Sequence, residues 1–224
     1  HKFSRDNLPV AVVYAAENDS RAASRLRNSC LKYRAEGFSP RVSFSETVIA
    51  KMCSGVTDTQ RIKKEGLHEV EDGASKAFLV EAYDHILVEE EAPAGFQRGI
   101  ERFVAKSDLD PFAQAKFLGH NAIHAMLGYL AKDRGIEFMH EAGASNDLME
   151  KAKAAFIDEA GVGLIREYAK VDDELFIEEG FMEYASDALR RMVNPFLRDP
   201  VARVTRDPAR KLGWEDRLLG AMKL

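Results

Sequence analysis

The chain has 224 residues, which at roughly 150 residues per domain corresponds to one large domain or to one and a half. Hydrophobic residues make up 46% and charged residues 31%, the composition of an ordinary soluble globular protein. The formal net charge of -5 argues against a general nucleic-acid binder, which carries a basic excess. No apolar run approaches the roughly 18 residues of a membrane span, and no signal peptide opens the chain.

Two cysteines, Cys30 and Cys53, are too few for a disulfide framework and fit a reducing compartment, so we expect a cytoplasmic protein. The chain begins with His1 rather than Met, and we therefore expect it to be a piece of a longer protein. The sequence carries no prediction of an oligomeric state.

The first third of the chain alternates short apolar runs with turn signals. A buried strand is predicted at residues 10–14, a helix at 21–33, and a short extended piece at 42–44. Residues 56–75 are charged and are predicted to be irregular, and two more strands are predicted at 77–82 and 85–89. Strands alternating with a helix indicate an α/β layer.

From about Pro93 the strand signals stop and helical periodicity takes over. Long helices are predicted at residues 110–135, 147–169 and 174–191, and residues 192–224 read as a basic, proline-containing loop. The fold class is therefore mainly α with an α/β part.

The first long helix carries the residues with the clearest chemical potential. At about 100° per residue, Asn121 and His124 are neighbours on one face, and Lys116 lies two turns before His124. All three side chains can project into one cleft. The structural alternative is that Lys116 extends along the helix to reach water and the histidines flank a packed face.

His120 and His124 also form an i, i+4 pair that could hold zinc. Asn121 stands where a zinc protease has its catalytic Glu, and the third ligand would have to be His140 or Glu141 at no recognisable spacing. No metal is therefore expected.

Several segments resemble motifs of the polyol-specific long-chain dehydrogenase/reductase family, also called the mannitol dehydrogenase family. The signature K-x4-N-x2-H is matched by Lys116, Asn121 and His124. Other matching segments, in chain order, are Ala16-Glu17-Asn18, Val80-Glu81-Ala82-Tyr83, Ile86-Leu87-Val88, Asn194-Pro195-Phe196-Leu197-Arg198-Asp199, Arg203-Val204, Arg206-Asp207-Pro208-Ala209-Arg210-Lys211-Leu212 and Asp216-Arg217-Leu218. The C-terminal motifs favour the mannitol-1-phosphate branch of the family.

The resemblance implies two domains. Residues 1–92 would be the C-terminal part of a Rossmann-type nucleotide-binding domain whose Gly-rich first half is absent, and residues 93–224 the helical C-terminal substrate domain. It implies NAD as cofactor and no metal. The family's pattern often has an Asp where Ala50 stands here, which bears on the identity of the polyol.

The resemblance also implies roles for individual residues. Lys116 matches the catalytic lysine, Asn121 and His124 match its polar partners, and Asn18 matches the asparagine that helps hold the reacting oxygen. Glu17 and Asn18 are expected on the cofactor side. The basic residues expected to bind the substrate are Arg191, Arg206, Arg210 and Lys211.

The implied reaction is hydride transfer between NAD(H) and a polyol phosphate, interconverting mannitol 1-phosphate and fructose 6-phosphate. A lysine can serve as its base only if its pKa falls from about 10.4 towards neutrality. Two alternatives stay open: the same family acting on an unphosphorylated polyol or a hexuronate, and a non-catalytic helical binding module. As a fragment, the chain is expected to be inactive or weakly active, with no nucleic-acid or membrane partner.

Overall fold

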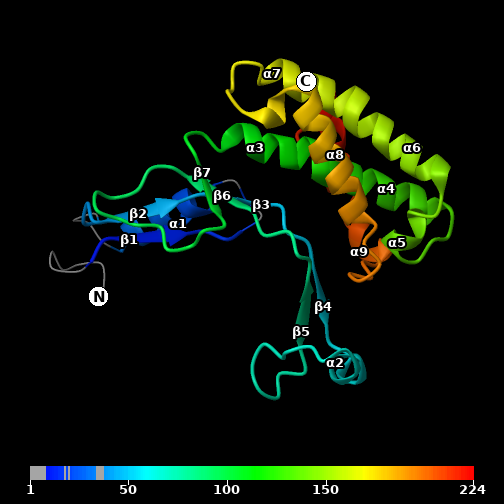
Figure 1. Ribbon diagram of the computed structural model, residues 1–224, viewed down its shortest axis with the longest axis horizontal. Helices are drawn as coiled ribbons and strands as arrows, with labels where there is room; N and C mark the ends of the chain where they lie inside the picture. Colours follow the sequence, from blue (N-terminus) through cyan, green and yellow to red (C-terminus); the bar gives the residue numbers. More distant parts are fainter. Residues whose placement is uncertain (1–8, 18, 20, 34–37) are drawn as a thin grey trace. The chain divides into compact units, whose positions relative to one another are not determined.

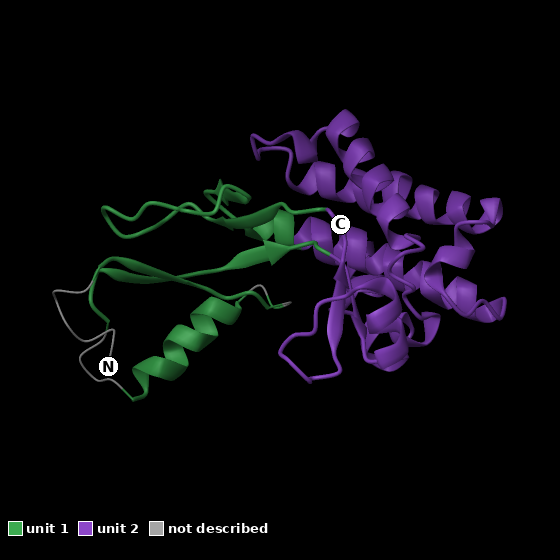
Figure 2. Cartoon of the chain, turned by 60° about the horizontal axis from the view of Figure 1, so that its bottom comes forward, with its two compact units in different colours: residues 1–51, 83–113 green, residues 52–82, 114–224 purple. Residues whose placement is uncertain are grey.

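The computed structural model describes residues 9–17, 19, 21–33 and 38–224. Its contacts divide the chain into two compact units, residues 1–51 with 83–113 and residues 52–82 with 114–224 (Figure 2). The units therefore interleave along the sequence. The domain boundary expected between residues 92 and 93 stays a prediction, and Asn18 lies outside the described residues.

The first unit opens with a strand, helix and strand, as predicted. Strand β1 (Ala11–Tyr14) pairs in parallel with β2 (Val42–Ser45), and α1 (Ala22–Leu31) lies between them in the chain. The buried Glu46 side chain accepts hydrogen bonds of 2.8 Å from the backbone N–H groups of Ala23 and Ser24. A carboxylate thus satisfies the N-terminal donors of α1, which is where helix ends favour negative charge.

A three-stranded sheet completes this unit, in the order β3 (Thr47–Ile49), β6 (Ile86–Glu89), β7 (Phe103–Lys106). Strand β6 is antiparallel to β3 and parallel to β7. The strand predicted at 85–89 is confirmed, but the expectation that strands stop at Pro93 is wrong. Strand β7 is a short edge strand, too short to show a period of two clearly.

The second unit begins with a hairpin of β4 (Cys53–Val56) and β5 (Ala77–Val80), with α2 (Thr59–Glu65) between the strands (Figure 1). The prediction that residues 56–75 are irregular is therefore wrong for Thr59–Glu65, which form a helix. The Asp58 carboxylate caps α2 by accepting from the N–H groups of Gln60 and Arg61, at 2.9 and 3.2 Å. Gly66 ends the helix in the left-handed conformation, with φ 64°.

The rest of the second unit is helical, which confirms the fold class of mainly α with an α/β part. Each of the three long predicted helices is present, but none is a single continuous α-helix: π-helical segments interrupt the first two, and the extended residue Ile177 interrupts the third. The elements are α3 (Asp110–Gln114), the π-helix η2 (Ala115–His120), α4 (Asn121–Asp133), α5 (Met139–Ala142), α6 (Asn146–Ala154), the π-helix η3 (Ala155–Gly161), α7 (Val162–Glu167), the 3-10 helix η4 (Glu174–Phe176) and α8 (Glu178–Met192).

The C-terminal segment is not the loop that was predicted. It forms α9 (Val201–Val204), α10 (Pro208–Lys211), α11 (Arg217–Gly220) and the 3-10 helix η5 (Ala221–Lys223). Pro200 precedes α9 and Pro208 opens α10. The start of a helix accommodates proline well, because its missing N–H group has no partner there in any case. Single helical turns are marginal alone, so tertiary packing holds them.

Helix α4 lies at the centre of the second unit and contacts α5, α6, α9 and α11. Its close approach to α9 depends on Gly128, because a Cβ atom there would lie 2.6 Å from Cγ1 of Val204. None of the described helices is both long and apolar enough to cross a membrane.

Replacing Gly128 with Ala should destabilise the chain by about 1–3 kcal/mol, because the added methyl group overpacks the contact between α4 and Val204. Urea unfolding followed by circular dichroism measures the change. The matched control is Gly99→Ala, where a Cβ meets no atom within 4 Å and little change is expected. A Gly128→Ala variant as stable as the wild type would contradict the close packing of α9 on α4.

Candidate active site

The predicted signature residues lie where a π-helix passes into an α-helix. At the end of η2 the N–H of Asn121 donates to the carbonyl of Lys116, five residues earlier. Short π-helical segments within α-helices are often found at functional sites. Lys116, His120 and His124 follow one another at intervals of four residues along this helix, so their side chains leave it in neighbouring directions.

The Lys116 side chain is half-buried, and its amine is easier to deprotonate than an ordinary lysine. Burial, which disfavours the ammonium, and the positive charge of Arg217 lower the pKa of Lys116 to about 8. Arg217 is itself held near the helix, with its guanidinium 5.3 Å from the centre of the Phe117 ring and its Nε 3.0 Å from the Asp216 carboxylate. An amine with this pKa can accept a proton near neutral pH.

His120, one turn after Lys116, is 4% exposed. Burial, and after it the electrostatic interactions with His124, Arg191 and Lys116, place the pKa of His120 well below its usual value, so the imidazole is neutral at pH 7. Its Nδ1 atom is buried without a hydrogen-bond partner among the described residues. His120 therefore places a neutral polar group between Lys116 and His124 on this helix.

His124 lies beside a buried carboxylate. Its Nε2 is 3.3 Å from Oδ2 of Asp199, which is 7% exposed. Arg203 holds both oxygens of the same carboxylate, through Nε at 2.6 Å and Nη2 at 2.5 Å. The helix histidine is thus connected to α9 through Asp199.

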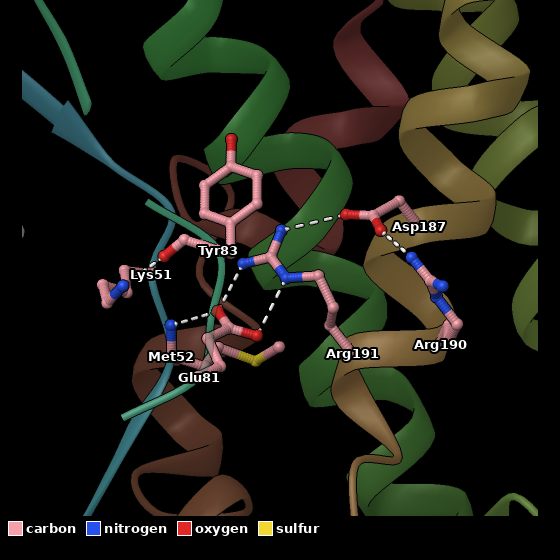
Figure 3. A network of polar contacts seen from close by, with 7 residues as sticks. All are labelled: Lys51, Met52, Glu81, Tyr83, Asp187, Arg190 and Arg191. Atoms are coloured by element: carbon pink, nitrogen blue, oxygen red, sulfur yellow. Dashed lines mark hydrogen bonds and ion pairs between the residues drawn. The ribbon is translucent and has the colours of Figure 1, made fainter. Parts of the chain in front are cut away.

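Arg191, near the end of α8, makes a second buried ion pair. Its Nε and Nη2 donate to the two oxygens of Glu81 at 2.9 and 2.6 Å, and its Nη1 lies 3.4 Å from Asp187 (Figure 3). The side chains of Arg191 and Glu81 are 10% and 4% exposed. Glu81 also accepts from the N–H of Met52 at 2.6 Å, so this pair fastens the start and end of the 52–82 segment to α8.

The other basic residues predicted to bind the substrate have different surroundings. Lys211 is buried, and its Nζ donates to the backbone carbonyls of Val204, at 2.7 Å, and of Arg206. Arg210 is exposed and pairs with Asp216 at 2.8 Å, and Arg206 is exposed. Substrate binding by these residues and by Arg191 stays a prediction.

The predicted cofactor residues belong to the first unit. Glu17 is exposed just after β1, and Asn18 lies outside the described residues. Within the described part of the chain, no group of three or more His, Cys, Asp or Glu side chains is arranged to hold a metal ion. Of the third ligands considered for zinc, Glu141 instead accepts from the N–H groups of Phe138 and Glu137, at 2.9 and 3.0 Å.

Two site residues were missed by the reasoning on chemistry: Glu81 and Asp199. Both lie within segments that matched family motifs, so a signal was present in the sequence. Their partners are far away in the chain, with Glu81 and Arg191 separated by 110 positions. Only the folded structure pairs them.

The arrangement described so far is a half-buried lysine with a lowered pKa, followed on one helix by Asn121 and His124. The family described as mannitol dehydrogenase C-terminal domain matches residues 108–224, more than half of the chain. The chain belongs to the mannitol dehydrogenase family. The match includes Lys116, Asn121, His124, Arg191 and Asp199.

Curated relatives named mannitol-1-phosphate 5-dehydrogenase agree with this assignment. The protein of Shouchella clausii is 30% identical over 217 residues, covering 96% of this chain and 53% of its own length. That of Halalkalibacterium halodurans is 28% identical over 218 residues, covering 97% and 53%. That of Caldanaerobacter subterraneus is 35% identical over 125 residues, covering 56% and 31%. The chain thus spans at most about half the length of these relatives.

Two solved structures share the fold. A mannitol 2-dehydrogenase of Pseudomonas fluorescens, in a ternary complex with NAD and D-mannitol, superposes with a TM-score of 0.67 at 17% identity, over 96% of this chain and 43% of that one. A substrate-free D-sorbitol dehydrogenase gives 0.64 at 16% identity, over 91% and 42%. These likenesses support the predicted combination of Rossmann-type strands and a helical domain.

The buried neutral His120 should make the chain less stable in mild acid. Below about pH 6.5 the unfolded chain takes up a proton on this residue that the folded chain excludes, so stability falls by up to about 1.4 kcal/mol per pH unit. Urea unfolding at pH 7 and pH 5 measures the loss, and His120→Gln should remove this part of it. The exposed His68→Gln variant is the control and should keep the wild-type dependence. An unchanged pH dependence in His120→Gln would contradict the assignment.

Proposed function

We propose that this chain is the substrate-binding and catalytic part of an NAD-dependent polyol phosphate dehydrogenase that interconverts mannitol 1-phosphate and fructose 6-phosphate. The observation that carries the proposal is Lys116, whose pKa is lowered to about 8, on one helix with Asn121 and His124. The names of the relatives support the phosphorylated substrate.

The proton chemistry of the proposal is assigned to Lys116. In the oxidation of the alcohol, its neutral amine takes the hydroxyl proton as the carbon loses hydride, and in the reverse direction the ammonium returns the proton to the carbonyl oxygen. Asn121 would donate a hydrogen bond to the oxygen that gains negative charge. NAD, when bound, would supply the acceptor for the hydride.

The described residues offer no pyrophosphate site at α1. The N–H groups of Ala23 and Ser24 at its N-terminus already bind the Glu46 carboxylate, and no Gly-rich turn precedes the helix. On the proposal, Glu17 and Asn18 lie on the cofactor side and the pyrophosphate is held by a segment outside this chain. Titration calorimetry of this chain with NADH should therefore show weak or no binding, whereas micromolar binding would contradict this division.

A second substrate class is favoured by the ion pairs of the basic residues. Glu81 and Asp187 already neutralise Arg191, and Lys211 donates to backbone carbonyls. An unphosphorylated polyol does not need a free positive charge from Arg191 or Lys211, whereas a phosphate does. A hexuronate would need the exposed Arg206 or Arg210 to bind its carboxylate. Comparing kcat/KM for mannitol and mannitol 1-phosphate distinguishes the two substrate classes. If the site is built for the phosphate, kcat/KM for mannitol should be lower several-fold or more, because mannitol lacks the charge-assisted contacts of the phosphate.

Replacing Lys116 with Ala tests the proposed base. In the protein extended by its upstream coding sequence, the variant should lose at least about 100-fold in kcat, the lower range of a general base's contribution, while circular dichroism shows an unchanged fold. The control is Lys132→Ala, an exposed lysine on the same helix, which should keep wild-type turnover. A Lys116→Ala enzyme within tenfold of wild type would show that another group is the base.

A further inference from the structure

The Nε2 atom of His124 is buried and aimed at a carboxylate, yet it lacks a well-aligned hydrogen bond. It lies 3.3 Å from Oδ2 of Asp199, and the two side chains are 16% and 9% exposed. No described residue gives this nitrogen a hydrogen-bond partner of good geometry. Catalytic hydrogen bonds are often long or poorly aligned before substrate binds.

A second side chain, Arg203, holds the Asp199 carboxylate in place. Arg203 binds both carboxylate oxygens, at 2.6 and 2.5 Å. Burial by itself raises the pKa of Asp199, but the contacts with His124 and Arg203 outweigh it, so the pKa lies below its usual value. The group is therefore a carboxylate at neutral pH, which accepts hydrogen bonds and cannot donate one.

The backbone around Asp199 is fixed on both sides. The N–H of Met139 donates to the carbonyl of Asp199 at 2.9 Å, and the N–H of Val201 donates to the carbonyl of Glu137 at 2.9 Å. This short antiparallel bridge joins the start of α9 to the segment before α5. The close packing of Val204 on Gly128 then presses α9 against α4, the helix that carries His124.

We propose that Asp199, clamped by Arg203, is a positioning residue that selects, for the neutral form of the His124 imidazole, the tautomer with its proton on Nε2. The two ring nitrogens point in different directions, so Nδ1 is left with a lone pair turned away from the carboxylate. On the proposed function, that lone pair accepts a hydrogen bond from a hydroxyl group of the polyol. Asp199 itself does not touch the substrate.

The neighbouring charges are consistent with this role. Arg203 neutralises Asp199, so the pair places no net charge beside the imidazole. The His120 ring lies 6.4 Å from the His124 ring, and His120 is neutral at pH 7 because its pKa is well below its usual value. The carboxylate of Asp199 is therefore the group that selects between the two tautomers of His124.

Nitrogen-15 labelling of the histidines tests the proposal on this chain directly. Long-range proton–nitrogen correlation spectra at pH 8 should show His124 with its proton on Nε2. In Asp199→Asn, whose amide can either donate or accept, the Nε2-protonated form should lose its predominance. The matched control is Asp147→Asn, an exposed carboxylate paired with Arg134 and Lys151, which should leave the His124 signals unchanged.

Two results would overturn the proposal: a wild-type His124 protonated on Nδ1, or an unchanged tautomer in a folded Asp199→Asn variant. The wild-type spectrum decides the matter even if the variant fails to fold. In the upstream-extended enzyme, Asp199→Asn should also lower kcat/KM by about 10- to 100-fold, by analogy with the loss of carboxylates that orient metal-bound histidines. Because the tautomer is measured without substrate, failure of the proposed dehydrogenase activity would leave that result standing.

Discussion

Burial of the helix formed by η2 and α4 is the constraint on which the site depends. This helix lies against α5, α6, α9 and α11, yet it carries a lysine and two histidines. Removing these groups from water penalises their charged forms, which lowers the pKa of Lys116 and keeps His120 neutral. The same packing that stabilises the second unit thus supplies an amine able to exchange a proton near neutral pH.

Two buried carboxylates of the unit are each paired with an arginine. Arg191 with Glu81 and Arg203 with Asp199 each form a two-bonded guanidinium–carboxylate pair, the geometry in which arginine binds carboxylates best. Each carboxylate also makes a second contact. Glu81 accepts a hydrogen bond from the backbone of Met52, at the start of the 52–82 segment, and Asp199 lies beside His124. The site is therefore supported by ion pairs that add no net charge to it.

Local features of the fold and site could be predicted from the sequence, and distant pairings could not. The spacing of Lys116, Asn121 and His124 is a property of one helix, and the three long helices have enough turns to show their period. Strand β7, helix α2 and the single turns α9–α11 are too short for that, and packing rather than pattern stabilises them. The partners Glu81 and Asp199 stood in family motifs, but their roles depend on contacts with residues far along the chain.

The most direct test of this account is the pKa of Lys116, measured in this chain from the carbon-13 shift of its Cε as the pH is raised. The account predicts a midpoint of about 8, because burial and Arg217 both disfavour the ammonium. Arg217→Gln should raise the midpoint, whereas Arg210→Gln, which removes the other arginine on Asp216, should leave it nearly unchanged. A midpoint near the ordinary lysine value of about 10.4 would contradict the central claim that this fold prepares Lys116 to act as a base.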